Sequence, residues 1–193
     1  MTPADPEPFR RFAAFVADVK SKHVGRDIAG NSKNYVPLSA LRGYWTPDNV
    51  ARVLHAFSGN NRLIIDIGVI KRQYLRIFST LVYSGPEAVL NLQRLFISYK
   101  LTDNNLPWRV RPSEWPDEKF FREFFKEKFA PHQWQFFPLG FHPDHLHDLI
   151  VGDDCILPID RPVQIFHSYA SDVEHFDIHD EYNHLERVCT SNL

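Results

Sequence analysis

The chain has little of several features that would define a class of protein. Its two cysteines, Cys155 and Cys189, are too few for a disulfide framework, and we expect reduced thiols. Charged residues such as Arg62, Asp66 and Lys71 interrupt the apolar stretches, so no segment is predicted to span a membrane. The N-terminus lacks the basic start and apolar centre of a secretion signal. We therefore expect an intracellular protein, cytoplasmic or nuclear, that is not secreted.

Glycine is scarce as well, with eight residues in the chain and none after Gly152. Apolar and aromatic residues are abundant: 44% of the 193 residues are hydrophobic, and sixteen are Phe. A chain of this length buries roughly 70% of the surface of its unfolded state. We expect a helical domain over residues 1–150 and an acidic C-terminal segment over residues 151–193.

The net charge of −2 is unevenly distributed. Residues 62–111 hold eight basic and three acidic residues, whereas residues 141–193 hold two basic and eleven acidic residues. The two regions therefore attract each other or select different partners.

Apolar spacing predicts helices over residues 6–23, 46–57, 62–83, 87–99 and 117–130. The sequence Thr46-Pro47-Asp48 is typical of a helix start, because Thr caps the first turn and Pro needs no N–H partner there. Two glycines and a proline predict a surface loop over residues 24–37. The expected fold class is mainly α, an irregular bundle of five or six helices.

The C-terminal segment predicts a small β-hairpin, with strands near residues 162–168 and 172–178. A two-stranded hairpin is marginally stable alone. We expect it to pack on the helical domain or to pair with a strand of another chain.

Four segments, in the same order, resemble parts of the helical region and first kinase strands of fungal protein-kinase-like proteins. They are IKRQYLRIFSTLVYSG (70–85), LTDNNLPW (101–108), FAPHQWQFFPLGF (129–141) and the tail that includes IHDEYNHL (178–185). The resemblance covers about residues 62–185. It implies a helical region of this family followed by two strands of a kinase small lobe.

The kinase chemistry is missing from the part that resembles the kinase lobe. By the resemblance, the glycine-rich loop over the ATP phosphates would fall at Phe166, Ser168 and Tyr169, none of which is glycine. No Val-Ala-x-Lys, His-Arg-Asp or Asp-Phe-Gly motif follows to hold phosphate, supply a base or bind magnesium. We therefore predict no enzymatic activity, no cofactor and no small-molecule substrate.

The resulting functional prediction is a non-catalytic protein–protein interaction module, a subunit or adaptor of a larger fungal assembly derived from a kinase-like ancestor. A protein partner is expected because the aromatic segment and the hairpin offer contact surfaces. The candidate partner-binding residues are Trp134, Phe136, Phe137, Phe141, Val163, Ile165, Phe166, Val173, Phe176 and Ile178.

The alternative prediction is a nucleic-acid or chromatin contact module that uses a basic face within residues 62–111. Phosphate contacts would come from basic side chains along this region. The candidates are Arg62, Lys71, Arg72, Arg76, Arg94, Lys100, Arg109 and Arg111.

One histidine-rich stretch suggests a third alternative, a metal site at His142, His145 and His147. Imidazole suits zinc, copper and nickel. Structural zinc sites draw a second pair of ligands from elsewhere in the chain, and the sequence does not identify that pair. We therefore expect a solvated loop here and no bound metal.

Overall fold

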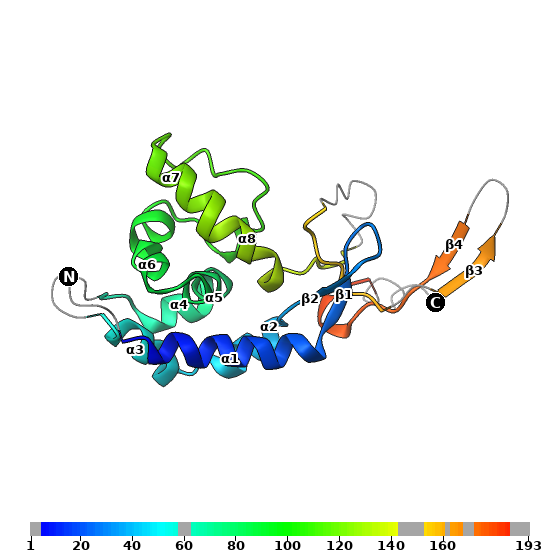
Figure 1. Ribbon diagram of the computed structural model, residues 1–193, viewed down its shortest axis with the longest axis horizontal. Helices are drawn as coiled ribbons and strands as arrows, with labels where there is room; N and C mark the ends of the chain where they lie inside the picture. Colours follow the sequence, from blue (N-terminus) through cyan, green and yellow to red (C-terminus); the bar gives the residue numbers. More distant parts are fainter. Residues whose placement is uncertain (1–4, 58–62, 143–152, 161–162, 168–171, 186–193) are drawn as a thin grey trace, which may run out of the picture.

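The computed structural model describes residues 5–57, 63–142, 153–160, 163–167 and 172–185. It is mainly helical, as predicted (Figure 1). The α-helices are α1 Glu7–Lys22, α2 Leu38–Tyr44, α3 Pro47–His55, α4 Ile67–Gln73, α5 Leu75–Ser84, α6 Pro86–Val89, α7 Lys119–Glu123 and α8 Ala130–Gln133. Two π-helical segments, Leu92–Ile97 and Phe124–Phe129, and 3₁₀ turns at Asp103–Asn105, Trp134–Phe136 and Asp180–Tyr182 connect or extend them.

Helix α5 lies at the centre of the helical body and contacts α1, α2, α4, α6 and α8 (Figure 1). Its residues from Ile77 to Val82 are all buried, as expected for a helix enclosed by other helices. Polar groups on such a helix need internal partners. Ser79 Oγ donates to Leu75 O (2.7 Å) and accepts from Trp45 Nε1 (2.8 Å).

The predicted helix over residues 62–83 is divided into α4 and α5. Tyr74 leaves the helical conformation with φ −132° and ψ 20°, and α5 begins at the next residue. The first N–H groups of a helix need acceptors outside it. Arg76 N donates to Asp103 Oδ2 (2.9 Å) and Ile77 N donates to Asp103 Oδ1 (3.0 Å). Because this cap comes from a distant turn, local periodicity does not reveal the break.

The predicted helix over residues 87–99 is also irregular, since α6 ends at Val89 and the chain continues as the π-helical segment Leu92–Ile97. By contrast, the predicted helix start at Thr46 is confirmed. The Thr46 side chain accepts a hydrogen bond from Asn49 N, and Pro47 occupies the first turn of α3.

The prediction of a loop over residues 24–37 is wrong, because it contains strands β1 Val24–Arg26 and β2 Ser32–Asn34, which pair antiparallel. Asn31 N donates to Asp27 Oδ1 (2.8 Å) in the connecting turn, and Gly30 has φ +81° there. On its other side β1 is held by Leu157: Arg26 N donates to Leu157 O (2.8 Å), and Leu157 N donates to Arg26 O (2.7 Å).

The small sheet that packs within the fold is therefore in the N-terminal region, not in the expected C-terminal position. The Cβ atom of any residue other than glycine at position 25 would lie 2.3 Å from Leu157 O, so this close approach requires Gly25. Neither short strand has alternating apolar residues, and their pairing depends on contacts with the C-terminal segment.

A second pair of strands, β3 Val163–His167 and β4 Asp172–His175, is antiparallel with an irregular register between Gln164 and Phe166. In Figure 1 this pair lies beyond the β1–β2 sheet, at the end of the molecule opposite α3. The bridges between the rest of the chain and the segments on either side of this pair include Arg26 with Leu157 and Phe141 with Asn183.

Candidate functional site

Trp134 lies at the edge of the helical body, at the start of the 3₁₀ turn that follows α8. Phe129, Gln133 and Phe136 are fully buried at helical spacing, so this side of the helical run faces the core. Trp134 follows Gln133 by one position, about 100° further around the helix. Its indole is therefore only partly buried.

The buried Gln133 holds a second tryptophan next to Trp134. Gln133 Nε2 donates to Trp108 O (2.6 Å), and Trp108 N donates to Gln133 Oε1 (2.9 Å). Both polar atoms of the buried amide are thereby paired. The Trp108 ring also stacks on Phe96, with ring centroids 5.9 Å apart.

The two tryptophans line a groove of about 520 Å³, which we call the tryptophan groove. Residues from the loop before α7, from α8 and from the C-terminal segment form its walls. They are Trp108, Arg109, Ala130, Pro131, Gln133, Trp134, Asp153 and Asp154. The groove thus combines aromatic faces with charged groups of both signs.

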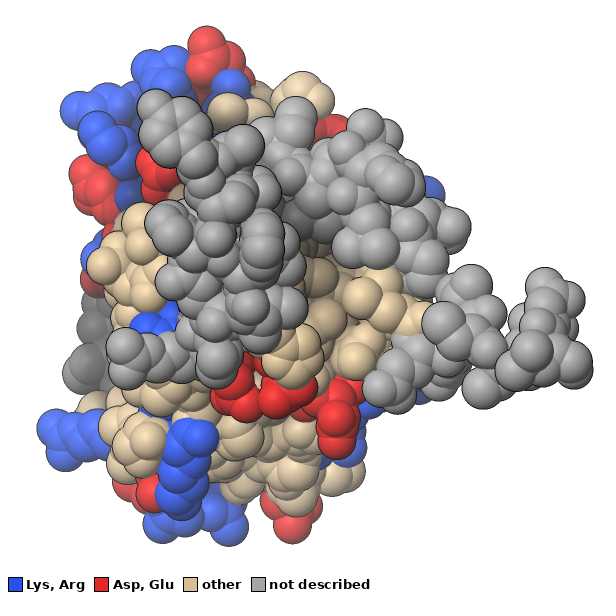
Figure 2. Space-filling model, turned by 90° about the vertical axis from the view of Figure 1, so that its right-hand side faces the viewer, with Lys and Arg blue, Asp and Glu red and all other residues tan. Residues whose placement is uncertain are grey.

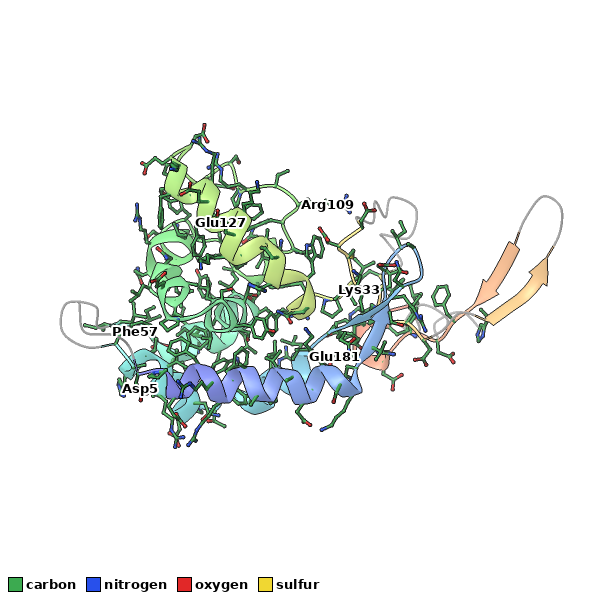
Figure 3. All side chains as sticks on the ribbon, viewed as in Figure 1. Asp5, Lys33, Phe57, Arg109, Glu127 and Glu181 are labelled. Carbon is green, nitrogen blue, oxygen red and sulfur yellow. The ribbon has the colours of Figure 1, made fainter. Side chains whose placement is uncertain are left out.

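A second cavity, of about 260 Å³, shares Pro131, Trp134 and Asp154 with the tryptophan groove, and we call it the lysine pocket. Residues from α1, β2, α5, α8 and the C-terminal segment form it. Its further lining residues are Lys20, Lys33, Tyr83, His132, Gln135 and Ile156. Figure 3 labels Lys33 on β2 and Arg109 on the loop before α7, each near the segment that begins at Asp153.

Burial influences the basic groups of the lysine pocket. It lowers the pKa of Lys20, whose Nζ donates to Gln135 Oε1 (2.8 Å). The pKa of His132 is lowered first by burial and then by the positive charges of Lys20 and Lys128. His132 is therefore neutral near pH 7, and its ring packs edge-on against Tyr83 with centroids 5.4 Å apart.

The structure separates the predicted partner-binding residues. Trp134 lines both cavities, and Phe176 is 39% exposed. Phe136, Phe137 and Phe141 are buried, so assigning them to a partner surface was wrong. Phe136 and Phe137 belong to the main core cluster, whereas Phe141 bridges to Asn183 of the C-terminal segment.

The remaining predicted partner residues belong to the C-terminal segment. Ile178 is partly buried and packs against a cluster of Tyr35, Ile156 and Tyr182. The backbone places Val163, Ile165 and Phe166 on β3 and Val173 on β4, and their side chains lie outside the described part of the structure.

Several of the predicted nucleic-acid-binding residues contact other parts of the body instead. The Arg76 guanidinium lies 5.2 Å from the centre of the Phe137 ring, and that of Arg94 lies 4.7 Å from the centre of Phe120. Arg111 donates to the backbone carbonyls of Trp115 and Pro116.

The other basic candidates are dispersed. Arg72, Lys100 and Arg109 are exposed, Lys71 is partly exposed, and Arg62 lies outside the described residues. On the face shown in Figure 2, Lys and Arg side chains are interspersed with Asp and Glu.

The predicted histidine site is described only at His142, because His145 and His147 lie outside the described residues. The His142 ring stacks on His184 with centroids 4.2 Å apart. Within residues 5–57, 63–142 and the described C-terminal stretches, no three His, Cys, Asp or Glu side chains gather as metal ligands would.

A chain of polar contacts connects Tyr35, His179 and Asp160. The Tyr35 hydroxyl is hydrogen-bonded to His179 Nδ1, and His179 Nε2 lies 3.2 Å from Asp160 Oδ1. Burial raises the pKa of Tyr35, so its hydroxyl stays neutral. Tyr35 is 1% exposed, and the Tyr182 ring packs edge-on against it. These contacts join the C-terminal segment to Tyr35, the residue that follows β2.

The groove residues outside the aromatic segment were missed by sequence reasoning. Lys20, Lys33, Arg109 and Asp154 come from different elements, and no spacing in the sequence relates them. The only usable signal was the aromatic segment around Trp134.

No family model matches the chain, and comparisons with curated proteins and with solved structures found no significant match. Among the helices of the described residues, none has the length and apolar character needed to cross a membrane.

Proposed function

We propose that this chain is a non-catalytic protein–protein interaction module, a subunit or adaptor of a larger assembly, derived from a kinase-like ancestor. It seats a segment of its partner in the tryptophan groove and the adjoining lysine pocket. The observation that carries the proposal is the partly exposed Trp134, which lines both cavities. Tryptophan and arginine are over-represented among residues that dominate binding energy at protein interfaces.

The construction of the groove supports binding. Gln133 holds the Trp108 backbone with two hydrogen bonds, so this wall is ordered before a partner arrives. A preformed wall lowers the entropy that binding costs. Charged residues surround the aromatic faces, namely Arg109, Asp153 and Asp154, as expected for the polar rim of an interface.

The test begins with the tagged full chain expressed at native level in its own cells. Proteins that co-purify in stoichiometric amounts are identified by mass spectrometry and produced as purified partners. Calorimetry then measures the dissociation constant for the wild-type chain and for Trp134→Ala. We expect Trp134→Ala to weaken binding by about 30-fold, which corresponds to the roughly 2 kcal/mol loss of an interface hot spot.

Two variants control this measurement. Ile64→Ala changes a residue that is 87% exposed and lies between α3 and α4, and it should leave the dissociation constant unchanged. Arg109→Ala should weaken binding by a smaller factor while leaving the core intact. Thermal unfolding shows whether Trp134→Ala is folded. Failure to recover any stoichiometric partner, or wild-type affinity in folded Trp134→Ala, overturns the proposal.

A further inference from the structure

The lysine pocket joins elements that are far apart in the sequence. Lys20 comes from α1, Lys33 from β2 and His132 from α8, and Trp134 forms the boundary with the tryptophan groove. Three basic side chains thus line one cavity of about 260 Å³ beside an aromatic face.

The Lys20 ammonium is partly buried and has only a neutral partner. An ammonium group has three donors. In the part of the chain that the structure describes, Lys20 Nζ has one hydrogen-bond acceptor, Gln135 Oε1 at 2.8 Å. The Gln135 side chain is oriented by its own hydrogen bond, in which Nε2 donates to His132 O (3.2 Å). A buried charge with a neutral partner retains part of its desolvation cost, which an anion would offset.

The other lysine of the pocket, Lys33, has an acidic partner. Lys33 Nζ lies 3.7 Å from Asp27 and is 45% exposed. Among the described lining residues, Asp154 is the one carboxylate and Lys20 and Lys33 are the two lysines. Burial lowers the pKa of His132, so this imidazole is neutral near pH 7. Because Asp27 offsets Lys33, Lys20 is the cation of the described lining that lacks a nearby carboxylate, and a singly charged anion matches it better than a doubly charged one.

We propose that the lysine pocket binds the carboxylate of an acidic residue in the partner segment, while a neighbouring apolar residue of that segment packs on Trp134. This inference rests on the proposed function and specifies the chemistry of its partner. The carboxylate accepts from Lys20 Nζ, with Lys33 as the second cation. Asp154 excludes doubly charged groups from the same position.

The test is an NMR titration of the full chain with sodium acetate, with acetamide as the neutral comparison and inorganic phosphate as the doubly charged one. The titrations are made at constant ionic strength and at a pH above the second pKa of phosphate, so that phosphate is doubly charged. The signals followed are the Trp134 indole N–H, assigned by its loss in Trp134→Phe, and the His132 ring. We expect saturable shifts with acetate, with a dissociation constant on the order of 10 mM, and none with acetamide. Lys20→Met should weaken acetate binding by about 5-fold or more, because the aliphatic stem stays and the charge is lost.

Lys126→Met is the matched control, since Lys126 is an exposed lysine in the helical run before α8 and does not line the pocket. It should bind acetate as the wild type does. Absence of saturable acetate shifts, equal binding by Lys20→Met, or tighter binding of phosphate than of acetate overturns the inference. Each of these outcomes leaves the proposed function standing if Trp134→Ala still weakens partner binding.

Discussion

The helical body and the attachment of the C-terminal segment are stabilised by different interactions. The body encloses Trp45, Phe78 and Phe129 among its fully buried side chains. The attachment, which we call the junction, has among the described residues a buried cluster of Tyr35, Ile156 and Tyr182.

Hydrogen bonds supplement this small cluster. Leu38 N donates to Tyr182 Oη (3.3 Å), while Ser39 N and Oγ donate to the Glu181 carboxylate (2.9 and 2.7 Å). Regions with few buried apolar contacts open at lower free energy than the core. The comparison therefore predicts that the C-terminal segment opens locally while the body stays folded.

Removing a central ring of the body should have the largest effect. Phe78 is fully buried on α5, and its ring packs against Trp45 with centroids 4.8 Å apart. We expect Phe78→Ala to lower the free energy of unfolding by about 3–5 kcal/mol, because it leaves a cavity. Urea unfolding followed by circular dichroism measures this. A loss equal to that of the exposed control Ile64→Ala would contradict the role assigned to the core.

The second effect concerns pH and the cap of α5. Burial raises the pKa of Asp103 to about 6, although the N–H groups of Arg76 and Ile77 oppose the shift. The folded state therefore holds the proton more tightly than the unfolded state. Protonated Asp103 makes its full contribution to the free energy of unfolding below about pH 4. As the pH rises through about 6, the free energy of unfolding falls by up to about 3 kcal/mol.

Urea unfolding of the wild type and of Asp103→Asn between pH 4 and pH 7 isolates the contribution of Asp103. The contributions of the other titrating groups are the same in both proteins and cancel when the two free energies of unfolding are subtracted. We expect the wild type to lose stability relative to Asp103→Asn as the pH rises. Parallel pH profiles of the two proteins would show that Asp103 ionises normally.

At the junction, we expect Tyr182→Phe to cost about 1 kcal/mol. The ring stays in its cluster, but the Leu38 N–H loses its acceptor. Hydrogen exchange should accelerate in residues 176–185 and stay unchanged in α5. Faster exchange in α5 would mean that junction and body unfold together.

The smallest effect is expected for Ser39→Ala, which removes the hydrogen bond from Ser39 Oγ to Glu181. Because this contact is exposed, we expect a loss of about 0.5 kcal/mol or less, again as faster exchange in the C-terminal segment. If Ser39→Ala lowers the stability of the junction as much as Tyr182→Phe does, the junction is stabilised mainly by its surface contacts.

The outcome for single residues shows how far the candidate site could be predicted. Of the predicted aromatic segment, Trp134 is partly exposed and lines both cavities, but Phe136 and Phe137, two and three positions later, are core residues. Their orientation depends on where the helical run ends, at a 3₁₀ turn that no cap in the sequence marks. Lys20 and Lys33 were not predicted, because their proximity to His132 arises from packing of separate elements.

Sequence was sufficient for features whose causes lie within a few residues. The apolar stripe of α1 and the Thr46 cap with Pro47 at the start of α3 are local, and both are present in the structure. Packing between distant segments decided the rest. Asp103 accepts from the first N–H groups of α5, Leu157 pairs with β1, and residues from α1, β2, α5, α8 and the C-terminal segment form the lysine pocket. The physical reason is range, since periodicity and capping act over one or two turns, whereas hydrogen bonds and burial join residues at any separation.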